Sequence, residues 1–267
     1  LTQVSRGDAA LDDLDLNPIL VRADSEDELV SSRGGARTEV PDTLDAQMVV
    51  DAKLALENGS KMQLSYNVEN TQRAIGTRLS SHIVRRFGMN GLREGHILVR
   101  LRGSAGQSLG AFATQGLRLD VIGDANDYVG KGLSGGMIVV RPSAAVGFVA
   151  SANTIIGNTV LYGATSGKLF AAGQAGERLC VRNSGATAVV EGSGSNACEY
   201  MTGGNVVILG EVGDNFGAGM TGGMAFIYDD AGHFESRVNR ESLQLLRIAH
   251  PHWENKLRDL VAEHARE

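Results

Sequence analysis

The 267-residue chain has 25 Lys and Arg against 31 Asp and Glu, with 42% hydrophobic and 21% charged residues, which is typical of a globular protein with a sizeable core. The net charge of -6 and the lack of a long basic run argue against nucleic-acid binding, and no apolar stretch approaches the roughly 18 residues of a membrane-spanning helix. Two cysteines, Cys180 and Cys198, are too few for a disulfide framework, and as free thiols they indicate a reducing cytoplasm.

The N-terminal hundred residues are expected to precede the main fold. Residues 1–40 are expected to form an extended linker or arm. The chain starts without an initiator Met or a signal peptide, which favours a fragment or a processed chain. Residues 41–100 are predicted to form a cap with a helix over 42–57 that ends at Gly59, a strand over 62–66 and a helix over 80–87.

A repeat follows over residues 101–232. Of the 35 glycines, 26 lie between residues 101 and 230, among Val, Ile, Leu, Phe and Met. Six segments align on one glycine at spacings of 20, 31, 18, 19 and 19 residues, and the long spacing indicates an insertion from Pro142 to Ile156. The aligned glycines are Gly116, Gly136, Gly167, Gly185, Gly204 and Gly223.

Each copy of the repeat has the same polar and apolar positions around its glycine. The residue two places before the glycine is always Thr, Ser or Asn, which suits a turn. The residue three places after it is always apolar, which predicts an inward stack. The stack consists of Leu119, Val139, Phe170, Ala188, Val207 and Phe226.

Apolar runs of four or five residues are too short for helices, so each repeat is expected to hold two or three short strands. This pattern predicts an all-β fold, a single-stranded right-handed parallel β-helix with the glycines at its corners. Residues 233–267 are expected to add helices, one capped by Asn239 and one after Pro251. Helices at both termini would cover the ends of the β-helix.

Two segments match the GxGxxG dinucleotide-binding pattern, residues 130–135 and 217–222. That pattern binds a pyrophosphate only where the loop opens a helix. Here both matches precede predicted strands at the same phase of two repeats, so turn architecture is the favoured interpretation.

For the other candidate catalytic or metal-binding residues, a structural role is also the favoured interpretation. Ser134 matches a GxSxG nucleophile elbow, but it aligns with turn residues of the other repeats. His250 and His252 flank a proline with no third metal ligand nearby. Cys198 reads as a buried apolar residue, and Asp124 and Asp127 as a polar corner. No catalytic, cofactor or metal residue is therefore predicted.

Several blocks resemble the glycine-rich C-terminal domain of glutamate synthases. They are GSAGQSLGAF at 103–112, GDANDYVGKGLSGG at 123–136, VRNSGA at 181–186 with VVEG at 189–192, CEYMTGG at 198–204 and NFGAGMTGG at 215–223. The resemblance runs from about Val68 to about Asp229.

The resemblance implies an enzyme that makes two glutamates from glutamine and 2-oxoglutarate. Its other parts would be an amidotransferase domain with a catalytic first cysteine and a domain with FMN and an iron–sulfur cluster. Ammonia would pass between them through a tunnel, and electrons would come from a small NADPH-dependent reductase subunit or ferredoxin. This chain would be the structural domain between them, without a cofactor of its own.

The chain departs from the family at Gln72 and at residues 195–197, where Asp and an Asp-His-Gly run are usual. Both are expected to be surface or corner positions. A stand-alone subunit that docks onto a redox enzyme, similar to the third subunit of formylmethanofuran dehydrogenase, remains an alternative. A free-standing enzyme for small molecules is a further one.

Overall fold

The computed structural model describes residues 5, 7–20, 41–241 and 243–267. The chain divides into two compact units, residues 1–41 and 42–267. The first unit contains two single-turn helices, α1 (Ala9–Asp12) and α2 (Asn17–Leu20). Most of the predicted linker, residues 21–40, lies outside the described residues.

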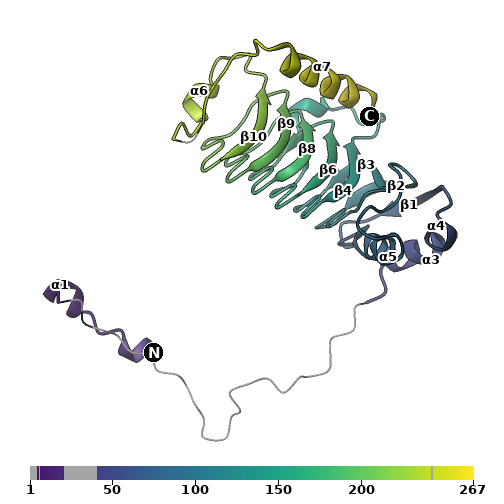
Figure 1. Ribbon diagram of the computed structural model, residues 1–267, viewed down its shortest axis with the longest axis horizontal. Coiled ribbons are helices and arrows are strands. Elements are labelled where there is room, and N and C mark those ends of the chain that lie inside the picture. Colours follow the sequence, from purple (N-terminus) through teal and green to yellow (C-terminus); the bar gives the residue numbers. More distant parts are fainter. Residues whose placement is uncertain (1–4, 6, 21–40, 242) are drawn as a thin grey trace, which may run out of the picture. The chain divides into compact units, whose positions relative to one another are not determined.

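The second unit is built on one parallel sheet of ten strands (Figure 1). Eight strands follow one another in the order β1-β2-β3-β4-β6-β8-β9-β10, and the short strands β5 and β7 lie off this path, with β5 between β3 and β7. The strands are β1 (Met62–Val68), β2 (Ile97–Ala105), β3 (Leu117–Ala125), β4 (Ser134–Arg141), β5 (Thr154–Ile156), β6 (Ser166–Ala171), β7 (Gln174–Ala175), β8 (Ser184–Val190), β9 (Thr202–Ile208) and β10 (Gly222–Ile227).

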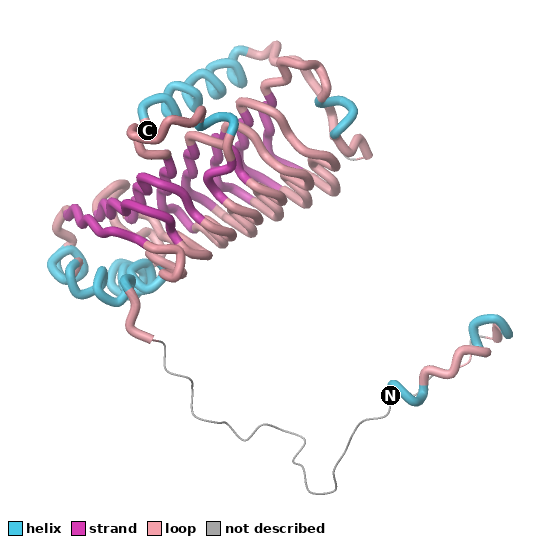
Figure 2. Tube along the Cα trace, turned by 180° about the vertical axis from the view of Figure 1, so that it is seen from behind, coloured by secondary structure: helices cyan, strands magenta, loops and turns pink. Residues whose placement is uncertain are grey.

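The prediction of an all-β right-handed parallel β-helix is therefore wrong. The described strands form a single parallel sheet, and helices α3, α4, α5 and α7 pack with it, so the fold is α/β. The period of about 19 residues predicts two or three strands in each repeat. Along the main path each repeat supplies only one long strand, because most of the remaining residues form tight turns that stack in register (Figure 2).

Both faces of the sheet are buried along β4, β6, β8 and β9, which carry continuous apolar runs, whereas β1 and β2 alternate between more buried and exposed residues. Neighbouring residues of a strand point to opposite faces, and the strands pair in register, so each face carries rows of aligned side chains. One row packs against the turns and contains Leu119, Ile138, Leu169, Ala188 and Val206. The other row contains Asp120, Val139, Phe170, Val189, Val207 and Phe226.

Three helices pack at the β1 end of the sheet: α3 (Leu44–Asp51), α4 (Lys53–Asn58) and α5 (Thr77–Phe87). The predicted helix over 42–57 is interrupted at Ala52, and Gly59 ends α4 in the left-handed conformation, as expected for a C-cap. Met48, Leu79 and Ile83 are fully buried between these helices and the sheet.

The C-terminal region contains α6 (Phe234–Arg237) and α7 (Pro251–Arg266). The predicted helix after Asn239 is wrong, since residues 243–249 have no regular structure and the Asn239 side chain accepts a bond from the Glu241 N–H, a local turn. Helix α7 packs on the face of β8 and β9 and not over an end of the sheet (Figure 1). Among the described residues, no helix combines the length and apolarity needed to cross a membrane.

Candidate functional site

The glycine-rich turns before the strands share an unusual backbone. In each turn, three residues spaced two apart have a left-handed φ near +60°. In the turn that leads into β4 these residues are Tyr128, Gly130 and Gly132, with φ of 62°, 64° and 63°. The corresponding triplets elsewhere are Ser108, Gly110 and Phe112; Thr159, Leu161 and Gly163; Arg178, Cys180 and Arg182; Asn196, Cys198 and Tyr200; and Asn215, Gly217 and Gly219.

This alternation lets each turn bond to both of its neighbours. The N–H of Gly130 donates to Leu109 O of the preceding turn at 2.8 Å, whereas the N–H of Gly132 donates to Tyr162 O of the following turn at 2.8 Å. The same pattern recurs at Cys180 and Arg182. The turns are therefore hydrogen-bonded to one another as regularly as the strands are, and buried backbone groups find partners.

This ladder accounts for both GxGxxG segments. The first precedes β4 and the second precedes β10, so neither opens a helix. The Gly130 and Gly132 amides donate to neighbouring turns, and the Gly217 amide donates to Ala197 O at 2.8 Å. Amides that are already bonded in this way are not available to a pyrophosphate.

Ser134 stands at the first position of β4. Its hydroxyl donates to the carbonyl of Phe112 in the preceding turn at 3.5 Å. Thr165, at the same position of its repeat, donates to Leu133 O of the preceding repeat, and Ser184, one place nearer its aligned glycine, donates to Ala164 O of the preceding repeat. These three hydroxyls therefore join neighbouring repeats.

The two cysteines occupy the middle left-handed position of adjacent turns and are fully buried. Burial raises the pKa of the Cys198 thiol to about 12. Burial, together with the adjacent Cys198, also raises the pKa of Cys180. Both side chains are therefore protonated thiols at neutral pH, which makes them poor nucleophiles.

The remaining polar candidates also form local bonds. His250 Nδ1 accepts from the N–H of His252 at 3.2 Å and caps α7. Asp127 Oδ1 accepts from the N–H of Asn158 in the next turn at 2.7 Å, while Asp124 is exposed. Within the described part of the chain, no group of three or more His, Cys, Asp or Glu side chains is placed to hold a metal ion.

The six aligned glycines serve two purposes. Gly116, Gly167, Gly204 and Gly223 have a left-handed φ between 88° and 100°. Gly136 and Gly185 do not, but a Cβ at Gly185 would lie 2.2 Å from Thr165 O. Close approach of two backbones requires glycine at that position.

The six residues of the expected stack are all buried, but they lie on two faces of the sheet. Leu119 and Ala188 belong to the cluster that faces the turns. Val139, Phe170, Val207 and Phe226 belong to the cluster beneath α7. Register shifts at the start of the strands displace residues by one position: between Ser184 and Thr187 the pairing of β8 with β9 shifts, so that Ala188 pairs with Val206 and not with Val207. A fixed count from the glycine therefore does not stay on one face.

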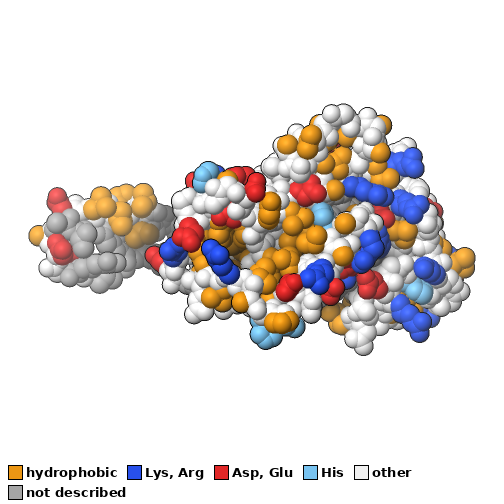
Figure 3. All heavy atoms as spheres, turned by 90° about the horizontal axis from the view of Figure 1, so that it is seen from above, with side chains coloured by type: hydrophobic (Ala, Val, Ile, Leu, Met, Phe, Trp, Pro, Cys, Tyr) orange, Lys and Arg blue, Asp and Glu red, His pale blue; other side chains and the backbone are white. Residues whose placement is uncertain are grey.

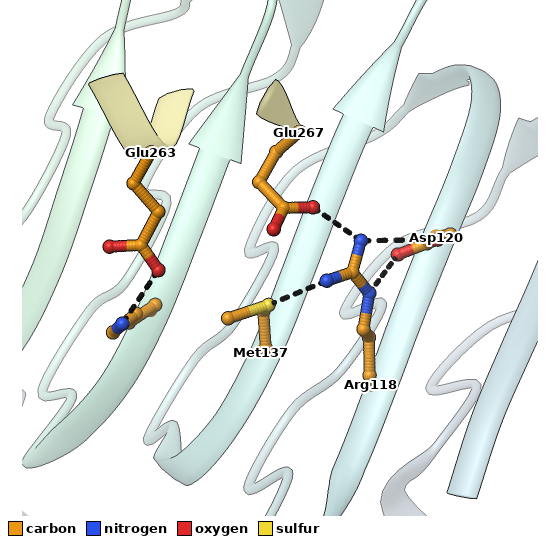
Figure 4. A network of polar contacts seen from close by, with 6 residues as sticks. Arg118, Asp120, Met137, Glu263 and Glu267 are labelled. Atoms are coloured by element: carbon orange, nitrogen blue, oxygen red, sulfur yellow. Dashed lines mark hydrogen bonds and ion pairs between the residues drawn. The ribbon is translucent and has the colours of Figure 1, made fainter. Parts of the chain in front are cut away.

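A polar network joins the end of α7 to the sheet, and the sequence pattern does not predict it (Figure 4). Arg118 on β3 bonds Asp120 Oδ1 at 2.7 Å and also pairs with Glu267. Burial alone would lower the pKa of Arg118, but its bonds to Glu267 and Asp120 raise that pKa above the ordinary value. The sequence signal is the pair of opposite charges two residues apart in β3, Arg118 and Asp120.

A second ion pair and a histidine contact continue along the same helix. Lys168 Nζ on β6 lies 2.6 Å from Glu263 Oε1, and His264 Nε2 lies 3.4 Å from Glu191 Oε1. Acidic and basic side chains are interspersed with hydrophobic ones on the face seen from above in Figure 3. The helix is thus held by opposite charges around an apolar centre.

Two surface hollows lie away from the turns. One of about 430 Å³ is lined by residues of α3, α4 and α5, among them Lys53, His82, Arg85 and Arg86. Another of about 240 Å³ lies where β9 and β10 end, next to α6. Neither of these two hollows includes a residue from the left-handed triplets.

The chain is similar in sequence to known proteins. Residues 45–267 match the family model described as GXGXG motif. Over its whole length the chain is 64% identical to a glutamate synthase [NADPH] large chain from Azospirillum brasilense, and it covers 18% of that protein. Over 80% of its length it is 48% identical to ferredoxin-dependent glutamate synthase 2 from Synechocystis, of which it covers 14%. Over 77% of its length it is 47% identical to a glutamate synthase [NADPH] large chain from Bacillus subtilis, of which it again covers 14%. The chain thus spans less than a fifth of these relatives.

Proposed function

The chain belongs to the GXGXG motif family, and we propose that it is the glycine-rich domain of a glutamate synthase and that it acts there as a structural domain. The observation that carries the proposal is the turn ladder. The residues that would otherwise suggest chemistry, namely the two glycine motifs, Ser134 and Cys198, all join one repeat to the next or fill the core.

In this role the domain would hold an amidotransferase domain and an FMN-binding domain in a fixed relation. The reaction would be the conversion of glutamine and 2-oxoglutarate to two glutamates, in the cytoplasm. A domain suits this task when its parts do not move against one another. Hydrogen-bonded strands on one side, hydrogen-bonded turns on the other and a helix across the sheet supply that rigidity.

The donor groups of this chain do not fit the cofactors of such an enzyme. An iron–sulfur cluster is held by several deprotonated cysteines, whereas Cys180 and Cys198 are the only cysteines and burial keeps them protonated. The glycine amides of residues 130–132 are bonded within the ladder and offer no cradle for the FMN phosphate. We therefore place FMN and the cluster in other parts of the enzyme, and the electron donor, a reductase subunit or ferredoxin, would act there.

The proposal is tested in the full-length synthase by measuring glutamate formed per glutamine hydrolysed. Ser134→Ala should leave the rate within about twofold and the ratio unchanged, because its hydroxyl makes only a 3.5 Å bond at a strand end. Val207→Asp places an unpaired charge in the core and should loosen the domain. Glutamine hydrolysis should then continue while less of its ammonia reaches glutamate.

Two results would contradict the structural role. One is a complete loss of activity in Ser134→Ala or Cys198→Ala with an unchanged melting temperature, since that would indicate a catalytic side chain. The other is an unchanged ratio in a Val207→Asp enzyme whose domain is shown by proteolysis to be unfolded.

A further inference from the structure

One repeat contains an insertion between β4 and β5. Aligned glycines are 18 to 20 residues apart elsewhere, but Gly136 and Gly167 are 31 apart. The additional residues form a loop over 142–153 that ends in the short turn η1 (Ala150–Ala152). In repeat proteins, insertions form loops on one face, and that face often binds a partner.

The tip of this loop, residues 146–149, exposes apolar side chains. Val146 is 43% exposed, Phe148 is 46% exposed and Val149 is 68% exposed. No charged residue occurs from Pro142 to Gly167. A partner surface would therefore not need to desolvate a charge of the loop on binding.

The loop has a defined shape although its apolar side chains point outward. Asn153 Nδ2 donates to Val149 O at 2.8 Å, and Gln174 Nε2 on β7 donates to Ser151 O at 2.9 Å. A loop held by such bonds loses little conformational entropy when it binds. Exposed apolar groups on a preorganised loop are characteristic of a binding site.

We infer that the tip, residues 146–149, docks into an uncharged apolar depression on another part of the same synthase polypeptide. This inference rests on the proposed function. The region that matches this chain is only 18% of the Azospirillum relative, so in such an enzyme most of the chain lies outside the domain. A neighbour on the same polypeptide is present at millimolar effective concentration, and a contact of four residues can then be stable.

The test uses the full-length synthase with the photo-crosslinking amino acid p-benzoylphenylalanine in place of Phe148. Illumination should join residue 148 to a peptide of the same chain outside residues 1–267, identified by mass spectrometry. Tyr228, which is 59% exposed and bonds Asp230 through its hydroxyl, is the matched control position and should give fewer such cross-links.

A Phe148→Ser enzyme adds a second measurement. Amide hydrogen exchange over residues 143–153 should become at least tenfold faster than in the unsubstituted enzyme, while exchange in β4 and β6 should not change. Cross-links only to a second copy of the chain, or to added vesicles, would overturn the inference, and so would none at all. If these results occur while Val207→Asp still uncouples ammonia from glutamate, the loop assignment fails and the structural role stands.

Discussion

Gly132 provides a stringent test of the turn ladder. Its φ is +63°, and a Cβ at this position would lie 2.5 Å from Cε1 of Phe112 in the preceding turn. Gly163, one turn further, has nearly the same φ of +62° but nothing within 4 Å of a Cβ. The destabilisation caused by alanine at the two positions should therefore differ only by the effect of the contact with the Phe112 ring.

The expected magnitudes follow from these contacts. A left-handed Ala is about 1 kcal/mol less stable than Gly in the same conformation, and this applies to both sites. Phe112 is 55% exposed, so its ring can rotate away from a new methyl group. It then loses the contacts of the part that is still buried. Full burial of Phe contributes about 1.5–3 kcal/mol, and less than half of that is about 1 kcal/mol. We expect Gly132→Ala to destabilise by about 2 kcal/mol and Gly163→Ala by about 1 kcal/mol.

Urea denaturation of the four proteins of a double-mutant cycle measures the contact directly. In a Phe112→Ala background, Gly132→Ala should destabilise by only about 1 kcal/mol, because no ring is left to displace. The effect of alanine on the unfolded chain is common to both glycine sites and cancels in the comparison. Equal losses at Gly132 and Gly163, together with no coupling to Phe112, would show that the ring contact is not what requires glycine.

Three further outcomes follow from buried groups. Phe170→Ala should destabilise the domain by about 3–5 kcal/mol in the same denaturation assay, because this ring is fully buried in the cluster beneath α7. Cys198 should resist iodoacetamide at pH 8 in the folded chain and react on unfolding, since its pKa of about 12 keeps it protonated; rapid labelling of folded protein would refute this. Burial raises the pKa of Asp45 above 3.8, so this group stabilises the fold when protonated and loses that contribution as pH rises through the raised pKa. Asn at this position cannot ionise, so the urea midpoint of Asp45→Asn should not fall over the same pH range.

The sequence predicted the repeat because both the strand and the turn have a strong local signature. Glycines two apart, as in Gly130 and Gly132, mark the left-handed positions, and apolar runs after them mark the strands. The signature is incomplete where Leu161 and Cys180 adopt the same backbone without being glycine. At those positions the hydrogen bonds from neighbouring turns fix the conformation, and no single repeat contains that information.

The same pattern does not predict the fold class, nor which residues point to which face of the sheet. A period gives the length of a repeat but not how many strands it holds, and here most of each turn is too tightly wound to form one. Irregular pairing at the strand starts moves Leu119 and Phe170 to opposite faces. The pairing of Arg118 with Glu267 joins residues 149 positions apart. Only the folded chain brings them together.

Helix α7 changes how the repeats depend on one another. Stacked repeats contact only their neighbours, so a local defect can separate one end of the sheet from the other. This helix runs across several strands at once: Glu267 pairs with Arg118 on β3 and Glu263 with Lys168 on β6, while Trp253 packs 6.2 Å from the ring of Phe226 on β10. Opening any repeat between β3 and β10 must therefore also release the helix. Repeats that otherwise contact only their neighbours become one cooperative unit, which is the property that a domain needs if it is to fix the distance between two others.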